Sequence, residues 1–71
     1  MEPLNQNELE ALRILWECGE SKPAEIQSRF SWPIENGTLR SVLVNLVEKE
    51  QVIRRLQGKA YFYAARVPKE T

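Results

Sequence analysis

The sequence predicts a mainly α-helical domain with a small β-hairpin, in the order of a winged helix-turn-helix: three helices followed by a two-stranded wing. Two observations predict this class. Apolar residues recur at helical spacing up to about residue 50, most clearly from Leu39 to Val47, and then at a period of two from Val52 to Ala65. A glycine between the two β-like runs is typical of a hairpin.

The first helix is predicted from about Gln6 to about Cys18. Asn5 is a suitable N-cap and Glu8 stands at the third helical position, which together make an Asn version of the capping box. Gly19 is placed to end the helix. Helical spacing, together with a hydrophobic staple between Leu4 and Leu9, leads us to expect a buried side that contains Leu9, Leu12, Leu15 and Trp16.

The second helix is predicted to be short, from about Pro23 to Phe30, because proline favours a first helical turn and Ser31-Trp32-Pro33 interrupts the pattern. Trp32 is expected to form a lid over this helix. Asn36-Gly37 is interpreted as a turn or cap. The third helix then runs from Thr38 to near Lys49 or Glu50, with its apolar side formed by Leu39, Val42, Leu43, Leu46 and Val47. Its opposite side contains Gly37, Ser41, Val44 and Glu48, flanked by Thr38, Arg40 and Asn45.

The two strands are predicted over Val52–Leu56 and Ala60–Ala65, joined by the three residues Gln57-Gly58-Lys59. An isolated hairpin is marginal in water, so one of its faces must pack on the helices. Tyr61 and Tyr63 share a face, which we expect to be the buried one, and Phe62 takes the other.

The composition excludes several classes of function. The chain has 71 residues, enough for one domain over 1–71, and it has one cysteine, Cys18, and no histidine. It has no aspartate either, and the absence of histidine and aspartate removes the usual general base and most metal ligands. No segment is typical of a signal peptide or a membrane span. We therefore expect a cytoplasmic protein that is not an enzyme and that has no cofactor and no metal.

The charge is distributed unevenly, although the net charge is zero. Residues 1–50 carry five basic groups against nine glutamates, a net charge of −4, whereas residues 51–71 carry five basic groups against Glu70, a net charge of +4. The predicted hairpin is thus a basic region on an acidic body. Such a distribution is compatible with nucleic-acid binding.

The predicted fold would offer the third helix to the major groove of DNA and the wing to an adjacent phosphate strand. The candidate DNA-binding residues are Asn36, Gly37, Thr38, Arg40, Ser41 and Asn45 in the helix region, and Arg54, Arg55, Gly58 and Lys59 in the wing. We expect Arg40 to contact a base and Lys59 a phosphate. A winged helix that binds proteins and not DNA is the alternative. A DNA-binding version should place Arg40, Arg54, Arg55 and Lys59 on one surface free of glutamates.

The chain also resembles a known family over Leu4 to Ala65. The resemblance depends on Leu4-x-x-x-Glu8-Leu9-x-x-Leu12-x-x-Leu15-Trp16, Ala24-Glu25-Ile26, Thr38-Leu39-Arg40-Ser41-Val42-Leu43, Leu46-Val47-Glu48-Lys49 and Gly58-Lys59-Ala60-Tyr61-x-Tyr63. In these motifs the chain is similar to the DNA-binding domain of the penicillinase/methicillin-resistance repressor family. It departs from the family at Leu9, where an aromatic residue is common, at Glu50, where glycine is common, and at residues 36–38, where an aromatic residue and two threonines are more frequent.

The resemblance implies a bacterial cytoplasmic repressor that binds double-stranded DNA at a palindromic operator. It also implies a homodimer in the full-length protein, formed through a further helical domain after the wing. That domain is absent from residues 1–71, so the chain alone is expected to be a monomer. Glu50 at the end of the third helix would occupy a left-handed position, at a cost of up to about 1 kcal/mol relative to glycine.

Overall fold

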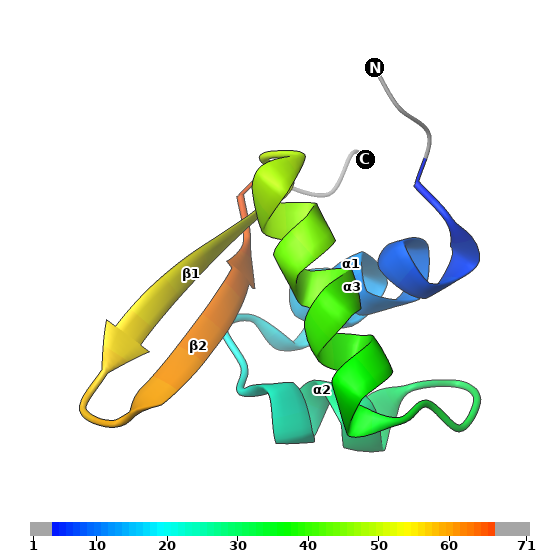
Figure 1. Cartoon of the computed structure of the whole chain (residues 1–71), viewed down its shortest axis with the longest axis horizontal. Helices are drawn as coiled ribbons and strands as arrows, with labels where there is room; N and C mark the ends of the chain where they lie inside the picture. The colour runs from blue at the N-terminus through cyan, green and yellow to red at the C-terminus, as the bar shows by residue number, and fades with distance from the viewer. Residues whose placement is uncertain (1–3, 67–71) are drawn as a thin grey trace.

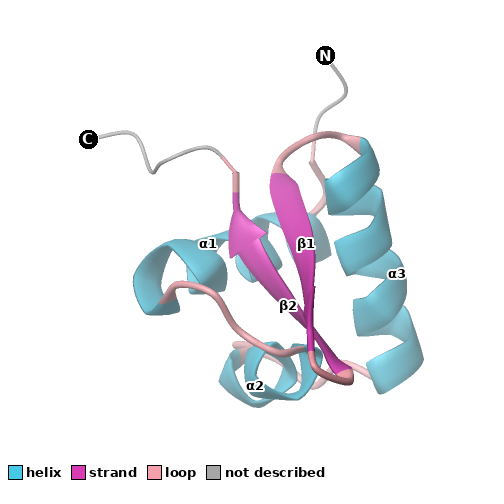
Figure 2. Ribbon diagram, turned by 90° about the vertical axis from the view of Figure 1, so that its left-hand side faces the viewer, coloured by secondary structure: helices cyan, strands magenta, loops and turns pink. Residues whose placement is uncertain are grey.

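Three helices are followed by one antiparallel hairpin in the computed structural model, which describes residues 4–66 (Figure 1). This order confirms the predicted winged helix-turn-helix. The elements are α1 (Gln6–Cys18), α2 (Pro23–Arg29), α3 (Asn36–Glu48), β1 (Val52–Gln57) and β2 (Ala60–Ala65). Seen from the hairpin side, the hairpin lies in front of α1 and α2, with α3 to one side (Figure 2). Within the described residues, no helix is both long and apolar enough to cross a membrane.

The predicted start and end of α1 are confirmed. The Asn5 side chain accepts a hydrogen bond from the Glu8 N–H at 2.8 Å, and the Glu8 carboxylate accepts one from the Asn5 N–H at 3.0 Å. Gly19 ends the helix with a φ of 79°. Both predicted caps therefore form, through groups that lie within a few residues of one another.

The buried side of α1 differs from the prediction at Leu9, which is 51% exposed. Leu12 and Leu15 are buried as predicted, and Ala11 and Ile14 are buried in addition, because α1 is covered from two directions, by the other helices and by β2. At about 100° per residue, Leu9 falls outside the arc that these neighbours cover. Leu4 and Trp16 are partly buried and pack against the core.

The core is shared by all three helices and the hairpin. The predicted apolar side of α3 is confirmed, with Val47 only partly buried, and α2 and the hairpin add three more buried residues: Ile26, Val52 and Tyr63. However, α3 begins at Asn36 and not at Thr38. Glu35 takes the extended N-cap conformation and its carbonyl accepts the Leu39 N–H at 2.9 Å, so Asn36-Gly37 forms the first helical turn.

The hairpin turn is tighter than predicted. Gln57 pairs with Ala60, which leaves two residues in the turn, and Gly58 has a φ of 64°. Glycine at the first central position is typical of a type II′ turn. Ser21, in the connector between α1 and α2, pairs with the other edge of β2 through two backbone hydrogen bonds to Tyr63, both of 2.9 Å.

Only one of the two wing tyrosines is buried. Tyr63 is 6% exposed and belongs to the core, as predicted, whereas Tyr61 is 45% exposed. The physical reason is the length of the hairpin: it diverges from α3 toward its tip, so the residues nearest the turn lie beyond the helices (Figure 1).

Candidate nucleic-acid interface

The outward side of α3 is a continuous exposed surface. Gly37, Ser41, Val44 and Glu48 succeed one another along it at helical spacing, and all four are exposed. The ten residues that the sequence predicts as DNA-binding are all exposed as well. The side of α3 opposite to its buried residues is therefore available to a partner over the full length of the helix.

An open hollow of about 490 Å³ separates the first half of α3 from the hairpin. Three predicted site residues, Asn36, Arg40 and Lys59, line it together. The Arg40 Nε donates a hydrogen bond of 3.0 Å to the Asn36 side-chain oxygen, one helical turn earlier. The remaining lining residues are Lys22, Pro23, Ala24, Ala60, Tyr61 and Tyr63. We call this region the basic hollow.

Lys22 is a residue of this site that the sequence analysis did not select. It lies in the connector immediately before α2, where the pairing of Ser21 with β2 brings it beside the hairpin. Its ammonium group lies 5.5 Å from the centroid of the Phe62 ring. The available sequence signal was a lysine just before a helix that begins with proline. Only the tertiary pairing brings it to the same hollow as Lys59.

The four cations that were expected on one surface are divided between two. Residues alternate between the faces of a strand, so Arg54 and Arg55 point to opposite sides of the hairpin. Arg54 lies on the face of Val52, with its guanidinium carbon 4.7 Å from the centroid of the Tyr61 ring. Arg55 lies on the other face and forms an ion pair of 2.6 Å with Glu20. The expectation of a shared surface free of glutamates is therefore wrong for Arg55.

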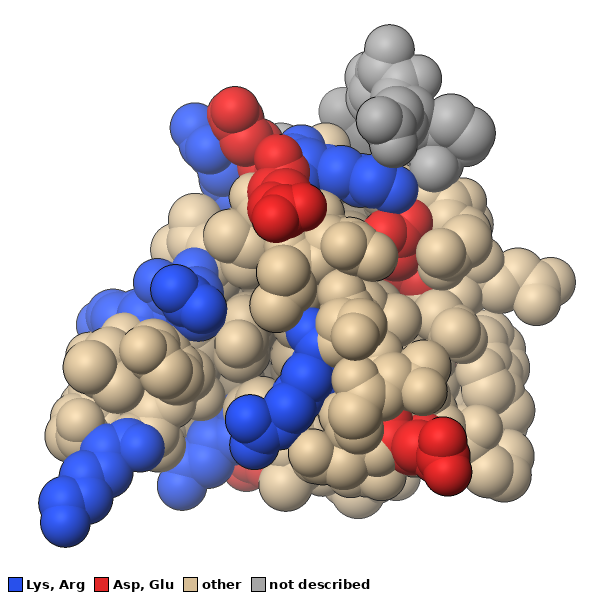
Figure 3. All heavy atoms as spheres, in the orientation of Figure 1, with Lys and Arg blue, Asp and Glu red and all other residues tan. Residues whose placement is uncertain are grey.

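The charges around α3 are unevenly distributed. In Figure 3, Lys and Arg side chains predominate over the hairpin and the side of α3 next to it, whereas at the upper end of the helix carboxylates and basic side chains lie together. None of the described residues that line the basic hollow is acidic. Arg40, Lys22, Lys59 and Arg54 form no ion pair with any residue among 4–66. This part of the surface is thus positive despite the neutral net charge.

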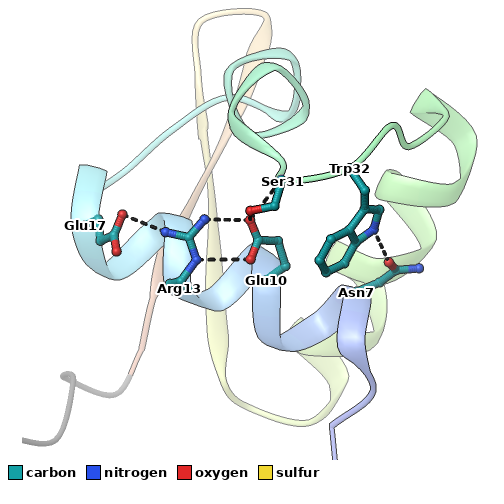
Figure 4. A network of polar contacts seen from close by, with 6 residues as sticks. All are labelled: Asn7, Glu10, Arg13, Glu17, Ser31 and Trp32. Carbon is teal, nitrogen blue, oxygen red and sulfur yellow. Dashed lines mark hydrogen bonds and ion pairs between the residues drawn. The ribbon is translucent and has the colours of Figure 1, made fainter.

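A second polar cluster joins α1 to the α2–α3 connection (Figure 4). Glu10, which is 8% exposed, accepts two hydrogen bonds from Arg13, of 2.6 and 3.0 Å, and two from Ser31, through its backbone N–H at 3.0 Å and its hydroxyl at 2.7 Å. Arg13 also pairs with the exposed Glu17 at 2.8 Å. We call these four residues the Glu10 network.

These hydrogen bonds hold the Glu10 carboxylate in its ionised form. The pKa of Glu10 is lowered from its ordinary 4.5 to about 2, first by the hydrogen bonds from Arg13 and then by those from Ser31, against the opposing effect of burial. The pKa of Arg13 is raised by the same contacts. Glu10 and Arg13 are therefore both charged at neutral pH.

Two further contacts tie the N-terminal part of the domain together. Lys49 at the end of α3 forms an ion pair of 2.9 Å with the buried Glu8. Burial raises the pKa of Glu8, but the backbone hydrogen bond from Asn5 and the contact with Lys49 outweigh it, so the pKa lies below its ordinary value. Trp32 donates a hydrogen bond of 3.0 Å to Asn7 and packs edge-on against Phe30, so it covers the end of α2 and the start of α1.

Comparisons with known proteins agree with this architecture. A family model described as the penicillinase repressor matches residues 4–71. A solved structure, the solution structure of the DNA-binding domain of the repressor BlaI, superposes with a TM-score of 0.73 at 20% sequence identity, over 97% of this chain and 90% of that chain. A comparison with curated proteins gave no significant match.

Proposed function

This chain belongs to the penicillinase repressor family, and we propose that it is a bacterial transcriptional repressor domain that binds double-stranded DNA in a sequence-specific manner. The family resemblance predicted from the sequence motifs is thereby confirmed, as is the winged-helix fold. The observation that supports the proposal most directly is the exposed side of α3 beside a basic hollow without carboxylates. The proposal includes a cytoplasmic location and no catalytic activity.

In this proposal α3 enters the major groove, which is about 12 Å wide and accommodates a helix. Small residues at Gly37 and Ser41 permit a close approach of the helix backbone to the bases, while Thr38, Ser41 and Asn45 supply hydrogen-bonding groups. Val44, which is 43% exposed, is suited to contact a thymine methyl group. These residue types on one exposed side are what direct readout requires.

The wing supplies the contacts to the DNA backbone. Lys59 lies in the turn and Arg54 on the face toward α3, so both can approach phosphates next to the groove that α3 occupies. The backbone N–H of Gly58 adds an uncharged donor at the tip. Arg55 remains a proposed contact, but it must first leave its ion pair with Glu20.

We further propose a palindromic operator that is bound by a homodimer of the full-length repressor. A single domain with about four to six phosphate contacts binds weakly near physiological salt. Two linked half-site contacts raise the avidity by about 10²–10⁴ through effective concentration. The half-sites are then expected about one helical turn of DNA apart, or a multiple of it.

The alternative, a winged helix that binds proteins, has less support. Its distinguishing feature would be the lack of a continuous basic surface, whereas Arg40 and Lys59 both line the basic hollow and form no ion pair with any described residue. Membership in a repressor family also favours DNA.

Selection of bound sequences from a random duplex pool, followed by a salt titration, tests the proposed function. The chain should enrich a defined half-site and lose affinity with a log–log salt slope of about −4 to −5. Lys59→Ala should weaken binding to all sequences about equally, and fusion to an unrelated dimerising helix should restore tight binding to a two-fold symmetric site. Salt-insensitive binding, or no gain from enforced dimerisation at any spacing, would favour the protein-binding alternative.

A further inference from the structure

Arg40 occupies a different position from the residues that face directly outward on α3. At about 100° per residue, Gly37, Ser41, Val44 and Glu48 form one stripe, and Arg40 lies on the flank of this stripe that faces the hairpin. Asn45 lies on the opposite flank and lines a separate hollow beside α1. Arg40 is therefore directed across the basic hollow toward the wing and not along the centre of the exposed surface.

The contact with Asn36 defines how the Arg40 guanidinium can be used. Its Nε is already engaged by the Asn36 side chain at 3.0 Å, and neither terminal nitrogen of the group forms a hydrogen bond with any described residue. Two adjacent terminal nitrogens, with four N–H donors between them, therefore remain at the end of a held side chain. A planar pair of this kind matches the oxygens of a phosphate.

The rest of the basic hollow has the same chemical preference. Lys59 contributes a cation from the wing, and none of the described lining residues carries a negative charge. Lys22 lines the hollow from the connector, with its ammonium group over the Phe62 ring. The aromatic ring of Tyr61 forms part of the wall. Arg40 and Lys59 line the same open hollow and form no ion pair with any described residue, an arrangement suited to a single anionic group.

We propose that the basic hollow binds one phosphate group, and that Arg40 is the residue that holds it. This inference rests on the proposed function when the phosphate belongs to the DNA backbone at the edge of the groove. Arg40 is then a backbone contact, and base readout falls to Ser41, Val44 and Asn45. A free phosphate would satisfy the same chemistry, so the experiment must distinguish the two sources.

The test uses the selected duplex with single methylphosphonate substitutions, each of which removes the charge of one phosphate. At one position the substitution should lower the affinity of the chain about tenfold, as expected for a hydrogen-bonded charge, and it should have little effect on Arg40→Ala. Arg40→Ala should also reduce the salt slope by about one unit and leave the base preferences unchanged. Arg29→Ala, which removes an exposed arginine outside the basic hollow, is the matched control and should retain the methylphosphonate effect.

Arg40 is exposed and helical, and alanine has a higher helix propensity, so the variant should fold. A change in base preference at one position in Arg40→Ala, with every methylphosphonate effect retained, would overturn the proposal. If the chain binds no duplex, the proposed function fails and inorganic phosphate becomes the probe. Amide shifts at Asn36 and Tyr61 that disappear in Arg40→Ala would then support a free-phosphate site, and their absence would overturn it.

Discussion

The Glu10 network and the basic hollow are both polar clusters built around an arginine, and they differ in whether the charges have partners in the protein. In the Glu10 network, Arg13 pairs with two carboxylates, and Glu10 accepts four hydrogen bonds. In the basic hollow, Arg40 has one hydrogen bond to a neutral amide, and no described lining residue is acidic. In the first cluster the charged groups are paired within the protein, whereas in the second Arg40 keeps hydrogen-bond donors and a positive charge that have no partner among the described residues.

This difference separates stability from binding. Removal of a partner from a complete buried cluster leaves unsatisfied groups, which lowers the free energy of unfolding. Removal of an exposed cation from an open hollow leaves no such groups and should affect only the binding of an anion. Mutations in the Glu10 network should therefore change stability, whereas mutations of the cations in the basic hollow should change anion binding. Four measurements of stability test this comparison.

The largest effect is expected at Tyr63, which lines the basic hollow and is also buried in the core. Tyr63→Ala should lower the free energy of unfolding by about 3 kcal/mol, because a buried aromatic ring is lost. Tyr61→Ala is the matched control on the same strand face, and it should change stability much less because Tyr61 is 45% exposed. Thermal and urea denaturation measure both. Equal losses for the two variants would contradict the assignment of Tyr63 alone to the core.

The next effect is expected at the centre of the Glu10 network. Glu10→Ala should destabilise the domain by about 2 kcal/mol, since Arg13 and the Ser31 N–H lose their acceptor. Glu17→Ala removes the exposed partner of the same arginine and should cost no more than about 0.5 kcal/mol. Urea denaturation at neutral pH distinguishes the two. A loss for Glu17→Ala as large as for Glu10→Ala would mean that burial is not what makes the network stabilising.

Acid should weaken the Glu10 network without removing any side chain. The folded-state pKa of Glu10 is about 2, below its ordinary 4.5, so the ionised carboxylate stabilises the fold fully above about pH 4.5. That contribution should be lost progressively as the pH falls from about 4.5 to about 2. Urea denaturation between pH 6 and about pH 2.5 should show this decline. Glu10→Gln should show a shallower decline, with the lowered pKa of Glu8 accounting for part of what remains.

The smallest effect is expected at Glu50, and it is a gain. Glu50 has a φ of 61° and follows the end of α3, where the Gln51 N–H bonds to the Leu46 carbonyl and the Glu50 N–H to the Val47 carbonyl, both at 3.0 Å. This is the Schellman arrangement, which favours glycine. Glu50→Gly should therefore stabilise the domain by about 1 kcal/mol.

The same substitution removes the exposed ion pair between Glu50 and Arg66, of 3.2 Å. Glu50→Ala removes the pair but keeps the side-chain carbon that disfavours positive φ, so it should leave stability nearly unchanged. A destabilised Glu50→Gly variant in thermal melts would show that an exposed pair outweighs backbone strain here. That outcome would weaken the contrast between exposed and buried charges.

Local sequence determined both ends of α1 and the buried side of α3. The capping box at Asn5 and Glu8, the stop at Gly19 and the period of the α3 apolar side are all short-range features, and each formed as predicted. The positive φ expected for Glu50 is a local feature as well. Such signals can be read from sequence because the interacting groups lie within a few residues of one another. The candidate site was predictable to the same extent, as the outward side of α3 and a basic wing.

Only the tertiary structure decided which of these residues meet. Leu9 and Tyr61 are exposed because the neighbouring helices and strands do not extend far enough to cover them. Arg55 is engaged in an ion pair because the fold brings Glu20 close to its guanidinium group. Lys22 joins the basic hollow through the pairing of Ser21 with β2, a contact over some forty residues of chain. Glu10 is buried because Ser31, in the α2–α3 connection, lies against its carboxylate and donates a hydrogen bond to it. Periodicity assigns a residue to a side of its own helix or strand, but the depth of its burial and its charge partners depend on elements far away in sequence.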